Sequence, residues 1–112
     1  MCMSIRYIIF VIDKPLNPAT PREMKSIDAF NEKLRAEGAW VTAAGIEGSS
    51  RSYLVDGRLD EATSRAGSII EGLENYSGFW IIESGSDEQA LELAKEASRA
   101  CQRRVELRPF LR

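Results

Sequence analysis

The chain of 112 residues contains no histidine and only two cysteines. Without histidine, the sequence lacks the commonest general base near neutral pH and the commonest protein ligand for zinc and haem iron. We therefore expect no metal and no cofactor, and any catalysis must use carboxylates, tyrosine, lysine or cysteine. Two distant cysteines do not form a disulfide framework. We interpret Cys101 as a reduced thiol packed on a helix, with a reactive thiol or a metal ligand as the alternative.

An excess of one charge and a long hydrophobic run are also absent. The chain has 15 basic and 17 acidic residues, whereas nucleic-acid-binding surfaces usually carry a strong basic excess. The apolar run Tyr7–Ile12 has only six residues, too few for a signal-peptide core or a transmembrane helix. We therefore predict a cytoplasmic protein that contacts neither nucleic acid nor a membrane.

The hydrophobic pattern predicts one domain over residues 1–112. Helices are expected after the capping boxes that begin at Thr20 and Ser86. Asp56–Gly57 indicates a tight turn after the third strand. Strands are expected at residues 5–12, 40–44, 51–55, 78–83 and 104–110. This order predicts an α+β fold, a ferredoxin-like sandwich in which two helices lie on one face of an antiparallel sheet.

The first and fourth of these strands are apolar on both faces. In the first strand, one face carries Ile5, Tyr7, Ile9 and Val11, and the other carries Ile8, Phe10 and Ile12. In the fourth strand, one face carries Phe79 and Ile81, and the other carries Trp80 and Ile82. A sheet with one face in water should alternate apolar and polar residues. Leaving the second face in water forgoes about 1.5–3 kcal/mol for each side chain. Because two helices cover only one face, we predict a homodimer in which another copy covers the second face.

Seven segments follow one another along the chain in the order YIIFVIDK, FNEKLRAEGAWVTAAGI, LVDGR, GSIIE, SGFWIIE, ALELAK and VELRPF. Their order and spacing resemble the YCII-related domain family, including its DGPF branch. The resemblance runs over nearly the whole chain. It implies a ferredoxin-like domain of the dimeric α+β barrel superfamily, in which two sheets pack face to face.

The reactive motifs of that family are incomplete in this sequence. The DGPF branch carries Asp-Gly-Pro-Phe-Ala-Glu, and AGSIIE stands in its place, so that Gly67 and Glu71 match while Ala66 replaces the acid. The other branch pairs an aspartate after the first strand with a histidine on the first helix. Asp13 resembles that aspartate, and its histidine has no counterpart. The resemblance therefore implies Asp13 and Glu71 as the candidates for catalytic acid or base.

Each candidate residue also has a structural interpretation. Glu71 is either a general acid or base at the mouth of a cavity or a surface carboxylate. Asp13 is either a base or ligand anchor, or a residue that turns the chain before Pro15. Candidate ligand-binding residues are Arg6, Tyr7, Tyr53 and Arg108. The alternatives are a solvated strand end for Arg6, a charge pair with Glu106 or the other subunit for Arg108, and core or interface positions for the tyrosines.

Two functional hypotheses remain at this point. The first is a small dimeric protein that binds a hydrophobic or carboxylated metabolite in a cavity between the sheet and the helices. The second is a cofactor-free enzyme of the isomerase, lyase or oxygenase type, which uses Asp13, Glu71 or both as acid or base. A second polar group next to one of these carboxylates, in one cavity, would favour the enzyme.

Overall fold

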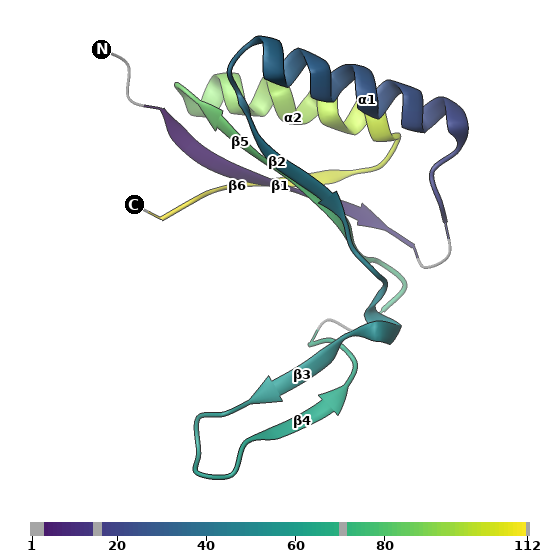
Figure 1. Ribbon diagram of the computed structural model, residues 1–112, viewed down its shortest axis with the longest axis vertical. Helices are drawn as coiled ribbons and strands as arrows, with labels where there is room; N and C mark the ends of the chain where they lie inside the picture. Colours follow the sequence, from purple (N-terminus) through teal and green to yellow (C-terminus); the bar gives the residue numbers. More distant parts are fainter. Residues whose placement is uncertain (1–3, 15–16, 70–71, 112) are drawn as a thin grey trace.

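The computed structural model describes residues 4–14, 17–69 and 72–111, and Figure 1 shows a four-stranded sheet, two helices on one of its faces and a separate hairpin. In chain order the elements are β1 (Ile5–Asp13), α1 (Pro21–Ala36), β2 (Trp40–Gly45), the 3₁₀ turn η1 (Ser49–Arg51), β3 (Tyr53–Asp56), β4 (Thr63–Ala66), β5 (Asn75–Ser84), α2 (Asp87–Cys101) and β6 (Val105–Pro109). The large sheet has the order β2-β5-β1-β6, and its neighbouring strands are antiparallel. The predicted α+β class is confirmed, and the topology is compatible with a ferredoxin-like fold.

Both helices begin at the residues that the sequence predicts. The Thr20 hydroxyl accepts a hydrogen bond from the Glu23 amide at 3.1 Å, and the Glu23 carboxylate accepts one from the Thr20 amide at 2.9 Å. The Ser86 hydroxyl accepts from the Gln89 amide at 3.1 Å, but the Gln89 side chain accepts from the Gly85 amide instead of Ser86. The second capping box is therefore only half formed. In the described parts of the chain, neither helix has the length and hydrophobicity needed to cross a membrane.

The core lies between the sheet and the helices. Tyr7, Ile9 and Val11 of β1 are buried in it, as the alternation predicts. Helix α2 contributes six buried residues, four of them alanine, whereas α1 contributes only Phe30 and Leu34. Small side chains let α2 pack closely on the sheet. The N-terminal half of α1 instead borders a pocket above β2 and β5.

The opposite face of the sheet is apolar, and we name it the open face. Its half-buried side chains are Ile8, Phe10 and Ile12 of β1 and Tyr76, Phe79 and Ile81 of β5. The rings of Phe10 and Tyr76 stack with their centroids 4.4 Å apart. Ion pairs border this face, with Arg6 on Glu83 at one end and Arg108 on Glu106 along β6. The structure thus confirms that β1 and β5 are apolar on both faces.

The hairpin of β3 and β4, which we name the arm, stands apart from the large sheet (Figure 1). The tight turn predicted at Asp56–Gly57 is wrong, because residues 57–62 connect the two strands. The Asp56 carboxylate instead accepts from the Arg58 amide at 3.1 Å and pairs with its guanidinium at 2.8 Å, which stabilises a wider loop. The radius of gyration is 16.1 Å, compared with about 13 Å for a compact domain of roughly this size.

Candidate functional site

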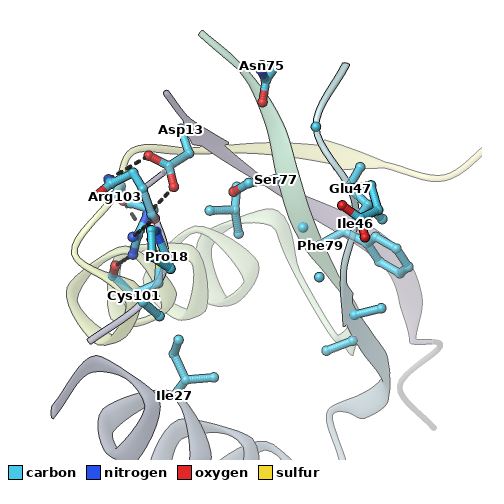
Figure 2. Close-up of a pocket in the computed structure, with 18 of the residues that line it drawn as sticks. Asp13, Pro18, Ile27, Ile46, Glu47, Asn75, Ser77, Phe79, Cys101 and Arg103 are labelled. Carbon is cyan, nitrogen blue, oxygen red and sulfur yellow. Dashed lines mark hydrogen bonds and ion pairs between the residues drawn. The ribbon is translucent and has the colours of Figure 1, made fainter. Parts of the chain in front are cut away.

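A large pocket opens between the N-terminal half of α1 and the adjoining ends of β1, β2 and β5 (Figure 2). Its volume is about 1060 Å³. Most of its wall is apolar, formed by Val11, Met24, Ile27, Ala43, Ile46, Phe79 and Trp80. Concave, mainly apolar sites with a few polar groups are the usual binding sites for small molecules. The pocket lies between sheet and helix, where the sequence predicts a cavity.

Asp13 lies at the end of β1, in the pocket wall, and is held from several sides. Figure 2 shows its carboxylate against the guanidinium of Arg103, whose Nε donates to Asp13 Oδ2 at 2.6 Å. The other oxygen accepts from the Lys14 amide at 2.7 Å and from Asn17 Nδ2 at 2.9 Å. The Asp13 and Arg103 side chains are only 10% and 9% exposed. This charge-assisted pair is therefore shielded from water.

Arg103 is itself bound through each of its three nitrogen atoms. Besides Asp13, its Nη1 donates to the Cys101 carbonyl at 2.6 Å and its Nη2 to the Asn17 carbonyl at 2.8 Å. The Glu23 carboxylate lies 3.6 Å from Nη1. Arg103 thereby joins β1, the start of α1 and the end of α2. Its guanidinium has little remaining capacity to bind a ligand carboxylate.

These contacts also set the proton affinity of Asp13. Burial alone would raise the pKa of Asp13, but hydrogen bonds from Asn17, Arg103 and the Lys14 amide, together with the positive charge of Arg103, hold the pKa below its ordinary value. A carboxylate with a lowered pKa is a weak base at neutral pH. The geometry favours the structural interpretation of Asp13, and its role as a catalytic base stays a prediction.

The lowered pKa of Asp13 predicts that wild type and Asp13→Asn differ in their free energy of unfolding by an amount that depends on pH. Because the folded pKa lies below the ordinary unfolded value of about 3.9, the charged pair contributes stability above that value and loses it as the pH falls through the folded pKa. The difference in free energy of unfolding should therefore be largest near neutral pH and shrink toward about pH 2. Urea titrations along this pH range measure it, and a pH-independent difference would contradict the assignment.

The second catalytic candidate, Glu71, lies outside the described residues. Its pairing with Asp13 therefore stays a prediction. The structure does place the other polar groups of the pocket, and Figure 2 shows Asn75 and Ser77 on β5 together with Asp13. Asn75 Nδ2 is buried without a hydrogen-bond partner in the described structure.

The four candidate ligand-binding residues are spread over the molecule, and none of them lines the pocket. Tyr7 is 1% exposed, and its hydroxyl donates to Asp87 at the start of α2; this hydrogen bond, and then burial, raises the pKa of Tyr7. Arg6 and Arg108 border the open face, and the Arg108 guanidinium also lies 5.6 Å from the centroid of the Phe10 ring. Tyr53 is on the arm. Their role in binding stays a prediction.

Sequence reasoning missed the hydrogen bond that fixes one wall of the pocket. Trp80 Nε1 donates to Asn31 Oδ1 at 2.7 Å. The Trp80 ring also packs edge to face on the Phe30 ring, with the two ring centroids 5.4 Å apart. The available signal was the polar Asn31 on the apolar stripe of α1, four residues after Ile27. A polar residue at that place needs a buried partner or a ligand.

Cys101 also lines the pocket, but it is 3% exposed, and burial raises the pKa of its thiol. A protonated, buried thiol reacts poorly, which fits a packed cysteine on α2. Within residues 4–14, 17–69 and 72–111, cysteine and carboxylate side chains form no group of three or more that could hold a metal ion.

Neither the known protein-family models nor the curated proteins match this chain. The resemblance to the YCII-related family therefore depends on the seven sequence segments alone. Membership in that family and the roles of its motif residues stay predictions.

Proposed function

We propose that this protein binds a small, mainly apolar metabolite in the pocket between α1 and the sheet. The observation that carries the proposal is the cavity of about 1060 Å³ with an apolar wall and polar groups at a few places. Asp13 supports binding over turnover, because Arg103, Asn17 and the Lys14 amide already occupy its carboxylate. A catalytic base needs access to a substrate proton.

The charged side chains around the pocket restrict the class of ligand further. The apolar body would lie against Met24, Ile27 and Trp80. If the ligand carries a carboxylate, its partners are Lys14 and Arg51, which line the pocket and are exposed. Among the residues that the structure describes, Arg51 pairs with the exposed carboxylate of Glu47 at 3.3 Å, and such surface pairs exchange partners at little cost. Arg103 is a poorer partner since its nitrogens are already bound.

The dimer predicted from the sequence is part of the same proposal. The open face presents six half-buried apolar side chains on two neighbouring strands. Contiguous apolar patches of this kind mark interaction surfaces. A second copy packed face to face on it would give the assembly that the resemblance to the YCII-related family implies.

Ile27→Trp should weaken the binding of a neutral apolar probe such as N-phenyl-1-naphthylamine by about tenfold or more, because the indole fills space that a ligand needs. Ser26→Trp is the matched control, since it adds the same side chain to an exposed neighbouring position that does not line the pocket. Probe fluorescence gives the affinities. In a Trp40→Phe variant that keeps Ile27 and Ser26, Trp80 is the one remaining tryptophan, and its emission provides a second readout of probe binding from the pocket wall.

Equal affinities of the Ile27→Trp and Ser26→Trp variants would place the probe elsewhere and overturn the assignment of the site. Failure of the wild type to bind any apolar probe, together with the absence of a co-purified small molecule in native mass spectrometry, would overturn the binding function itself.

A further inference from the structure

The arm carries apolar side chains that no other described residue covers. Tyr53 is 72% exposed and Val55 is 67% exposed. They lie on one face of the hairpin, because each is two residues from the other and they pair across the ladder with Ala66 and Ser64. Leu59 in the connecting loop is exposed as well. A two-stranded hairpin without further packing is marginally stable in water, so the arm needs a covering surface.

The arm and the open face border the same space. In Figure 1 the large sheet and the arm diverge like the two sides of a V, and the helices lie outside it, on the far face of the sheet. The molecule is only 18 Å thick along this viewing direction, so the V is not produced by overlap of distant parts. The arm makes at most sparse contacts with the other helices and strands. It therefore does not cover the open face of its own chain.

A second copy of the chain is the occupant that satisfies both surfaces. In a two-fold pair, each copy contributes one open face and one arm, so both of these apolar surfaces gain a partner at once. The net charge of −2 lets two copies approach with little repulsion. An unrelated partner would need to match the sheet and the arm separately.

We propose that β3 and β4 form a dimerisation arm, which packs Tyr53 and Val55 against the copy that lies on the open face. This inference rests on the proposed dimer and adds a second contact to it. The arm begins directly after residues 45–51, which line the mouth of the pocket. A partner that fixes the arm therefore also fixes one rim of the binding site.

The first experiment compares Val55→Lys with Thr63→Lys by analytical ultracentrifugation. Both changes add one positive charge to the same hairpin. Thr63, however, lies on the face opposite to Val55 and is the cross-strand partner of Asp56, whose negative charge favours a lysine at that position. Val55→Lys should raise the dissociation constant of the dimer by about a hundredfold, because a two-fold interface carries the change twice. Thr63→Lys should change it by less than about threefold.

The outcomes separate the two proposals. Wild-type dimers that persist equally in both variants overturn the arm contact and leave the open-face dimer standing, whereas a monomeric wild type overturns both. Hydrogen exchange of the wild type provides an independent measurement. Amides of β3 and β4 should exchange about tenfold or more slowly in the dimer than after dilution to monomer. Equally fast exchange at both concentrations contradicts a covered arm, whatever the pocket binds.

Discussion

Replacing Arg103 with methionine is expected to lower the free energy of unfolding by about 3–5 kcal/mol. The change leaves the carboxylate of Asp13, which is only 10% exposed, without its counter-charge. It also removes the contacts of the guanidinium with the Cys101 and Asn17 carbonyls, which tie the end of α2 to the segment before α1. Methionine keeps the length of the side chain, so the cost reflects the lost pairing more than a cavity. Urea unfolding followed by tryptophan fluorescence measures it.

Arg104→Met is the matched control for this prediction. Arg104 pairs with Glu74 at 2.5 Å, but both side chains are exposed, and surface pairs contribute about 0–1 kcal/mol. Adding Asp13→Asn to Arg103→Met should recover part of the loss, because no unpaired charge then remains buried. If Arg103→Met costs no more than Arg104→Met, the pair of Asp13 and Arg103 does not stabilise the fold.

The fold is largely readable from the sequence because local signals agree with it. Alternation places Val105 and Leu107 toward the core and Glu106 and Arg108 on the open face, as observed. The arm is harder to predict. Its returning strand, β4 (Thr63–Ala66), is polar, so neither its existence nor its register has a hydrophobic signal.

The site is less readable because it depends on contacts between distant parts of the chain. Arg103 reaches Asp13 from 90 residues away. It does so because Gln102 adopts a left-handed conformation at the end of α2, with φ 54°, where the sequence has no glycine to signal the turn. Strand alternation does exclude one combination of the candidate ligand-binding residues. Arg6 and Tyr7 are neighbours on β1 and point to opposite faces, so they cannot line one cavity on the sheet.

At Gly78 the backbone of β2 lies close to β5. Gly78 pairs with Gly45 of β2 and with Val11 of β1. A Cβ atom at Gly78 would lie 2.9 Å from the Ala44 carbonyl oxygen and 3.4 Å from the Gly45 Cα. Both are backbone atoms of β2, so no side-chain rotation can relieve the contact. An added methyl group must push the edge strand β2 away from β5 and distort the pocket wall that both strands form.

Gly78→Ala is therefore expected to lower the free energy of unfolding by about 1–3 kcal/mol, as overpacking does, and to weaken probe binding in the pocket. Gly48→Ala is the matched control for stability alone, because Gly48 also lines the pocket: nothing lies within 4 Å of a Cβ there, and φ is −67°. At such a position alanine is neutral or stabilises by about 0.4–1 kcal/mol, because it restricts the unfolded chain. Urea unfolding gives both values, and hydrogen exchange should show faster exchange in β2 of Gly78→Ala alone. Equal stability and equal exchange in the two variants would mean that β2 can move without cost, and the pocket would then have no rigid wall on that side.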